Sequence, residues 1–271
     1  MKFLIFWDIY WKKWRQMLAK YLPDLRAKYT PDVIIANNEN ISHGKGPRMH
    51  QIEWCLDQGI DILTGGNHSL ESQEDIREYM DRPDSKQLRP LNTFGEDVPW
   101  VGERVFVIPP TPLSQGGSKK ILVINALGTA FMKQEYANPF PLIDEILHKY
   151  NEENLEAILV DFHKETTAEG YAMANYLDGR ASLLWWTHTH IQTADAEIWP
   201  GWLGFICDIG FIWARRSVVG VDWETIKHRF IENRQEWLMS PDDNWPGVLS
   251  GMYAEIVDKK CIKIEPFRIC E

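Results

Sequence analysis

Two histidines in a His-x-His pair, His188 and His190, end an apolar run that reads LLWWTHTH. Side chains two positions apart on an extended segment point to the same side, so both rings can reach one ion. Imidazole together with carboxylate suits Zn, Fe or Mn. Alone, such a pair is more often structural than metal-binding, so its meaning depends on what else lies nearby.

Polar residues follow four other apolar runs in the same way. They are Asp8, Glu39 and Asn40 in NNEN, Asn67 and His68 in GGNH, and Asp161 and His163 in DFH. Taken singly, an Asp after a strand is usually a helix cap, and NNEN or GGNH is a turn. In open α/β sheets, however, the functional crevice lies at the carboxyl ends of the strands, so one rim would gather all five segments. Together they predict a metal site.

The candidate ligands are too many for one tetrahedral structural zinc ion. Two-metal sites hold their ions about 3.5–4 Å apart and need a shared carboxylate. We therefore expect two ions and assign the bridging position to Glu39.

Short apolar runs alternate with longer amphipathic segments, and such runs are typical of strands buried on both faces. The expected strands span residues 2–7, 32–36, 60–64, 104–108, 120–126, 156–160, 181–186 and 203–207. The expected helices span residues 12–28, 47–58, 71–80, 139–152 and 167–177. This alternation predicts an α/β fold with a loop in the Pro-, Asp- and Arg-rich segment 81–103. No repeat or linker divides the chain, so we expect one domain.

Composition excludes several classes of protein. A formal charge of -10 argues against binding duplex nucleic acid or an anionic membrane surface. No window approaches the roughly 18 apolar residues of a membrane span, and MKFLIFWD lacks a cleavage site, so we expect a cytoplasmic protein. Four dispersed cysteines without a CxxC pair indicate reduced thiols.

The order and spacing of six motifs over about residues 1–226 resemble the YmdB-like branch of the calcineurin-like metallophosphoesterases. The motifs are DIY with Asp8, NNEN, GGNH, DFHKETTAE, THTHIQTAD and DIG at 208–210. The resemblance implies an αββα sandwich formed by one metallophosphoesterase domain, residues 1–271. It implies two metal ions, iron or manganese, and phosphodiesterase activity on small phosphodiesters such as 2′,3′-cyclic nucleotides. It is also compatible with a homo-oligomer.

The resemblance further implies a role for each candidate residue. One metal ion is expected at Asp8, Glu39, Asn40 and His190, and the other at Glu39, Asn67, His163 and His188. A hydroxide that bridges the two ions is expected to attack phosphorus while His68 protonates the departing ribose oxygen. Asp161, Glu165 and Asp195 are expected to orient the histidines, although each also suits a helix cap or a surface charge.

Tryptophan is the commonest aromatic residue, 13 against 11 Phe and 9 Tyr, and six indoles fall where relatives usually carry glycine. They are Trp7, Trp11, Trp14, Trp186, Trp202 and Trp213. Glycine permits positive φ or close backbone approach, which Trp cannot provide without strain. We hypothesise that the source reads UGA as glycine, as some bacterial lineages do. The alternatives are real divergence, with indoles filling a reshaped site, and a chain that misfolds or binds metal poorly as written.

Two other functions fit parts of the pattern. A non-catalytic regulatory or binding protein could keep the same fold and even the metals. A metal-dependent amidohydrolase can also use His-x-His, but that class places the pair on the first strand of a (β/α)₈ barrel. Here the pair comes late in the chain, so a phosphodiesterase is the function we expect.

Overall fold

The computed structural model describes residues 1–69, 71, 73–93, 101–110, 117–233, 240–241 and 246–271. Its strands form two six-stranded sheets. Among the described residues, no helix has the length and apolar character needed to cross a membrane.

The first sheet has the strand order β10-β11-β1-β2-β3, and β12 pairs with β11. Its strands are β1 (Lys2–Phe6), β2 (Val33–Asn37), β3 (Ile62–Thr64), β10 (Ile212–Ala214), β11 (Gly247–Val257) and β12 (Lys260–Cys270). Strands β1, β2 and β3 are parallel, so their carboxyl ends meet at one edge, while β11 runs antiparallel to β1.

The second sheet has the strand order β4-β5-β6-β7-β9-β8. Its strands are β4 (Glu103–Ile108), β5 (Lys119–Leu127), β6 (Ala157–His163), β7 (Leu183–Thr187), β8 (Glu197–Ile198) and β9 (Gly204–Ile206). The four central strands are parallel, and the edge strands β4 and β8 are antiparallel to their neighbours.

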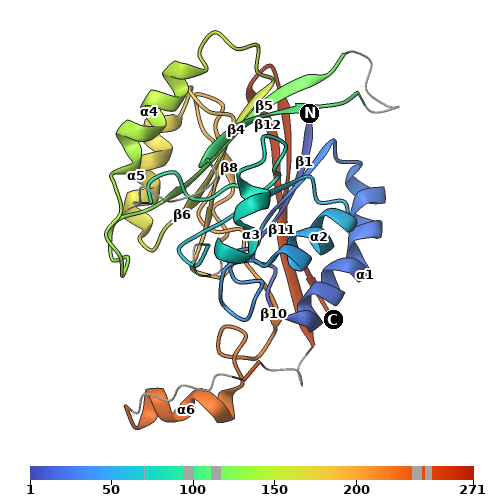
Figure 1. Ribbon diagram of the computed structural model, residues 1–271, viewed down its shortest axis with the longest axis vertical. Coiled ribbons are helices and arrows are strands. Elements are labelled where there is room, and N and C mark those ends of the chain that lie inside the picture. The colour runs from blue at the N-terminus through green and yellow to red at the C-terminus, as the bar shows by residue number, and fades with distance from the viewer. Residues whose placement is uncertain (70, 72, 94–100, 111–116, 234–239, 242–245) are drawn as a thin grey trace.

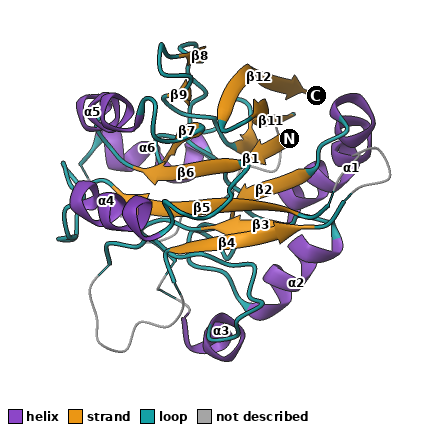
Figure 2. Cartoon of the chain, turned by 90° about the horizontal axis from the view of Figure 1, so that it is seen from above, coloured by secondary structure: helices purple, strands orange, loops and turns teal. Residues whose placement is uncertain are grey.

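Helices cover the outer face of each sheet (Figures 1 and 2). The helices are α1 (Lys12–Tyr29), α2 (Met49–Asp57), α3 (Gln73–Met80), α4 (Pro139–Lys149), α5 (Thr167–Leu177) and α6 (Trp223–Ile231). Helices α1, α2 and α3 lie on the side of the first sheet, and α4 and α5 on the side of the second. Helix α6 projects from the body of the molecule at the bottom of Figure 1.

Three clusters of buried apolar residues hold these layers together. One lies between the two sheets and combines side chains of β1, β2 and β11 with those of β5, β6 and β7. The other two join each sheet to its own helices. The resulting α/β/β/α arrangement confirms the αββα sandwich.

Local sequence explains where several helices begin. Asn138, Thr166 and Asp222 stand at the N-caps of α4, α5 and α6, and each side chain accepts a hydrogen bond from a backbone N–H of the first turn. Such caps satisfy N–H groups that have no partner within the helix. Pro139 follows its cap directly, where the missing N–H costs nothing.

All the expected strands and helices are present, with bounds shifted by a few residues. In the segment 81–103, residues 81–93 contain neither helix nor strand, β4 begins at Glu103, and 94–100 lie outside the described residues. The sequence analysis missed β8, β10, β11, β12 and α6. The four cysteines are free thiols, as expected, and three of them are buried.

Candidate metal centre

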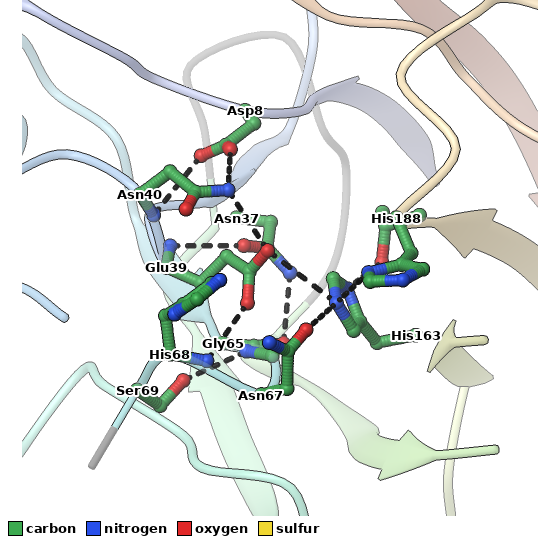
Figure 3. Close-up of polar contacts among 12 residues, drawn as sticks. Asp8, Asn37, Glu39, Asn40, Gly65, Asn67, His68, Ser69, His163 and His188 are labelled. Carbon is green, nitrogen blue, oxygen red and sulfur yellow. Dashed lines mark hydrogen bonds and ion pairs between the residues drawn. The ribbon is translucent and has the colours of Figure 1, made fainter. Parts of the chain in front are cut away.

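The polar residues that follow the strands gather at the carboxyl ends of strands from both sheets (Figure 3). Asp8 follows β1, Glu39 and Asn40 follow β2, and Asn67 and His68 follow β3. From the second sheet, His163 ends β6 and His188 follows β7. The centre is therefore built by both sheets of the sandwich.

Three side chains converge at the Nε2 atom of His163. It lies 2.8 Å from Asn67 Oδ1, 2.9 Å from His188 Nδ1 and 3.4 Å from Glu39 Oε1. One ligand atom each from Glu39, His163 and His188 lies within 4.8 Å of the other two. These side chains, with the Asn67 amide oxygen, can surround one metal ion.

The hydrogen bonds of His163 fix which ring nitrogen carries the lone pair. The Thr187 hydroxyl donates to Asp161 Oδ1 at 3.1 Å, so its oxygen must accept from His163 Nδ1, 2.8 Å away. Nδ1 therefore carries the proton, and Nε2 presents a lone pair to the oxygens of Asn67 and Glu39. Burial lowers the pKa of His163 well below its usual range, so a second proton does not fill this gap. A metal cation fits it.

Glu39 is fully buried beside His163. Its Oε1 accepts from Asn40 Nδ2 at 2.9 Å, and its Oε2 accepts from the backbone N–H of His68 at 3.2 Å. Burial, followed by the neighbouring Asp8 carboxylate, raises the pKa of Glu39 well above its usual range. A bound cation favours the ionised form of such a buried carboxyl.

Gly66 allows the close approach of Glu39 and His163. A Cβ at position 66 would lie 2.1 Å from Glu39 Oε2 and 2.6 Å from His163 Cε1. No side chain fits there without displacing both groups. The second glycine of GGNH is thus required by packing.

Two carboxylates hold the His188 loop. Glu165 Oε2 lies 2.9 Å from His188 Nε2, and Asp208 accepts from the backbone N–H of Thr189 at 3.0 Å and from its hydroxyl at 2.8 Å. Burial lowers the pKa of His188, which favours the neutral ring. A carboxylate on one ring nitrogen leaves the other free to bind metal. The sequence analysis gave Asp208 no role, although its place after an apolar run was a usable signal.

Asp161 acts on His163 through Thr187 and does not contact a histidine ring itself. Its carboxylate accepts from Asn37 Nδ2 at 3.0 Å, Thr64 Oγ1 at 2.5 Å and Thr187 Oγ1 at 3.1 Å. Burial raises the pKa of Asp161 to about 6. Asn37, which the sequence analysis did not single out, also accepts the backbone N–H of Glu39 at 3.1 Å and so shapes the NNEN turn.

Asp195 lies apart from the gathered residues. Its carboxylate accepts from the Tyr171 hydroxyl at 3.2 Å and from the backbone N–H of Cys207 at 3.2 Å. Within the described part of the chain, no hydrogen bond joins Asp195 to a histidine.

Asp8 and Asn40 are hydrogen-bonded to each other, and His190 lies among aromatic rings. The Asp8 carboxylate accepts from the backbone N–H of Asn40 at 3.3 Å and forms a very short bond with Asn40 Nδ2. Burial raises the pKa of Asp8 to about 8. His190 packs against Trp7 and Phe211, and its Nδ1 is buried without a hydrogen-bond partner among the described residues.

His68 adjoins the centre, because its backbone N–H donates to Glu39 Oε2. Its Nδ1 is 2.7 Å from Glu71 Oε1, and its side chain is 36% exposed. Glu71 thus holds one ring nitrogen and leaves the other available to a bound molecule.

Two of the six tryptophans at expected glycine positions have a glycine-like backbone. Trp11 has a φ of 24° and Trp202 a φ of 73°. Positive φ is strained for a bulky side chain. Trp186 is packed against Gly170, where a Cβ would lie 1.8 Å from the indole Cζ2.

The chain is similar in sequence to known proteins. The sequence model of the YmdB-like protein family matches residues 4–267. A 2′,3′-cyclic-nucleotide 2′-phosphodiesterase of Bacillus subtilis (strain 168) is 34% identical over 267 residues, which cover 98% of this chain and 96% of that protein.

Solved structures agree as well. A novel phosphatase from Mycoplasma pneumoniae superposes with a TM-score of 0.88 at 30% identity, covering 100% of this chain and 94% of that one. A hypothetical protein from Thermus thermophilus superposes with a TM-score of 0.86 at 27% identity and covers all of both chains. The chain therefore belongs to the YmdB-like protein family.

Proposed function

We propose that the chain is a metal-dependent phosphodiesterase, a phosphoric diester hydrolase, that acts on small phosphodiesters and foremost on 2′,3′-cyclic nucleotides. The convergence of Glu39, Asn67 and His188 on His163 Nε2 carries the proposal, because carboxylate and amide oxygens together with imidazole nitrogens are ligand atoms that hold metal ions in proteins. The similarity to the Bacillus subtilis phosphodiesterase supports the reaction and the substrate class.

One metal ion would be held by Glu39, Asn67, His163 and His188. Imidazole, carboxylate and amide ligands suit iron or manganese. A bound ion of this kind neutralises charge on a phosphoryl group and lowers the pKa of water. Thr187 and Glu165 support this set, because each engages the ring nitrogen that faces away from the centre.

A dinuclear centre requires a second set, which would be Asp8, Asn40 and His190 with Glu39 shared. These residues do not fit a metal ion in their present arrangement, because Asn40 presents its N–H groups to Asp8 and His190 faces aromatic rings. No step of the reaction is assigned to them.

His68 is the proton donor in this proposal. Glu71 engages its Nδ1 and orients the ring, so Nε2 is left to protonate the departing ribose oxygen. Its backbone N–H binds Glu39, which ties the proton donor to the metal ligands.

Turnover of bis-p-nitrophenyl phosphate and 2′,3′-cyclic AMP with added Mn²⁺ or Fe²⁺ tests the proposal. We expect activity that a chelator abolishes, that Asn67→Ala and His163→Ala remove, and that His68→Ala lowers by roughly 10²–10⁴-fold. His148→Ala, which removes an exposed ring on α4, is the matched control and should leave activity unchanged. A metal-loaded protein without turnover would instead favour a regulatory or binding protein.

A further inference from the structure

The indole of Trp7 lies against two histidines that were assigned to different metal ions. Trp7 stands between the end of β1 and Asp8 in the chain, and its side chain is fully buried. Its ring centroid lies 6.0 Å from that of His163 and 4.8 Å from that of His190, and both pairs meet edge to face. Its indole N–H is buried and has no hydrogen-bond partner among the described residues.

His190 is consequently held in an apolar contact. Its ring lies against Trp7 and, with a centroid distance of 4.4 Å, against Phe211. Its Nδ1 is buried without a partner in the described part of the chain. His190 therefore faces aromatic rings and not the oxygen and nitrogen atoms of the other candidate ligands.

The second ion needs these residues to approach Glu39. Ions of a two-metal site lie about 3.5–4 Å apart, and ligand nitrogen and oxygen atoms lie about 2.0–2.2 Å from them. Among the described residues, the group of possible ligands within 4.8 Å of one another contains Glu39, His163 and His188, but neither Asp8 nor His190. Asp8 is bonded to the N–H groups of Asn40 instead.

We propose that Trp7 restricts this chain to one metal ion, held by Glu39, Asn67, His163 and His188, and that removal of the indole lets His190 complete a second site. The inference rests on the metal site of the proposed function, but not on its substrate. The contact with His190 comes from a single side chain, the indole at position 7.

Metal content of the full-length protein tests this inference. The chain as written, loaded with Mn²⁺ and desalted, should retain one ion by elemental analysis, whereas Trp7→Gly should retain two. Electron paramagnetic resonance should change from the six-line signal of isolated Mn²⁺ to that of a coupled pair. Trp202→Gly is the matched control, because its indole is 47% exposed at a φ of 73° and lies outside this contact, and it should retain one ion.

A second pair of variants keeps the test decisive if Trp7→Gly fails to fold by circular dichroism. In the chain that retains Trp7, His190→Ala should leave the single ion in place, while His188→Ala should remove it. Two ions in the chain as written, or loss of the ion in His190→Ala, would overturn the inference. So would one ion in a folded Trp7→Gly protein, or no ion in the chain as written.

Metal content and phosphodiester hydrolysis test this inference and the proposed function separately. A change from one ion to two without any phosphodiester hydrolysis would support the role of Trp7 and contradict the phosphodiesterase. Hydrolysis by a chain that already holds two ions would support the enzyme and contradict the role of Trp7.

Discussion

Thr187→Val removes the hydroxyl that fixes the protonation of His163 while keeping the shape of the side chain. In the native chain, Thr187 Oγ1 donates to Asp161 at 3.1 Å and lies 2.8 Å from His163 Nδ1. Valine can neither accept from Nδ1–H nor donate to Asp161. The proton is then free to move to Nε2, where it removes the lone pair that faces Glu39 and Asn67.

We expect Thr187→Val to lower both the stability of the fold and the affinity for metal. A buried Nδ1–H without an acceptor should lower the free energy of unfolding by about 1–3 kcal/mol. Loss of a group that orients a metal-binding histidine weakens metal affinity by roughly 10–100-fold. Competition for Mn²⁺ with a fluorescent chelator measures the affinity, and urea unfolding measures the stability. Thr187→Ser keeps the hydroxyl and should restore metal affinity.

A folded Thr187→Val protein that binds Mn²⁺ as tightly as the native chain would refute the reasoning. His163 would then reach its metal-binding form without help from Thr187. Weak binding by both Thr187→Val and Thr187→Ser would show that the methyl group, and not the hydroxyl, matters at this position.

Three further predictions concern packing, pH and the tryptophans. Gly66→Ala places a Cβ 2.1 Å from Glu39 Oε2, so Glu39 must move. Because misplacing a group in an active site by about 1 Å can lower the rate roughly 10²-fold, kcat/KM for bis-p-nitrophenyl phosphate should fall by about that factor. An unchanged kcat/KM would contradict the packing argument. Burial raises the pKa of Asp208 to about 7 and that of Asp8 to about 8, so the native metal-free protein binds protons that the unfolded chain has released. Its stability to urea in a chelator should therefore fall as pH rises from about 7 to about 8, and a rise would contradict these assignments. If UGA encodes glycine in the source, the intact mass of the native protein will be lower than that of the printed sequence by six exchanges of Trp for Gly; a mass with all 13 indoles would exclude the hypothesis.

The strands and helices that place the site could be predicted because apolar periodicity marks them directly. Apart from the two-residue strand β8, the elements that the sequence analysis missed all lie after residue 207, for physical reasons. Strand β11 is buried almost throughout, but Ser250 and Gly251 interrupt its apolar run. Strand β12 contains Pro266, which fits an edge strand but weakens a strand signal in sequence. Helix α6 has a single buried residue, Ile226, so little apolar pattern marks it.

The types of the gathered residues were also predictable, because strand ends meet at one rim. Their mutual contacts were not. Thr187 meets His163 because β6 and β7 pair in a register that sets these two residues side by side. Register between strands cannot be read from either strand alone. The contact of Trp7 with His190 likewise joins segments far apart in the chain.

Anomalous diffraction from crystals soaked with Mn²⁺ tests the central claim most directly. The account predicts a peak within bonding distance of Glu39 Oε1, His163 Nε2 and His188 Nδ1, with Asn67 completing the set. Loss of the peak in His163→Ala would confirm that these side chains hold the ion. A peak elsewhere, or no peak in a folded native protein, would contradict the metal centre and the phosphodiesterase built on it.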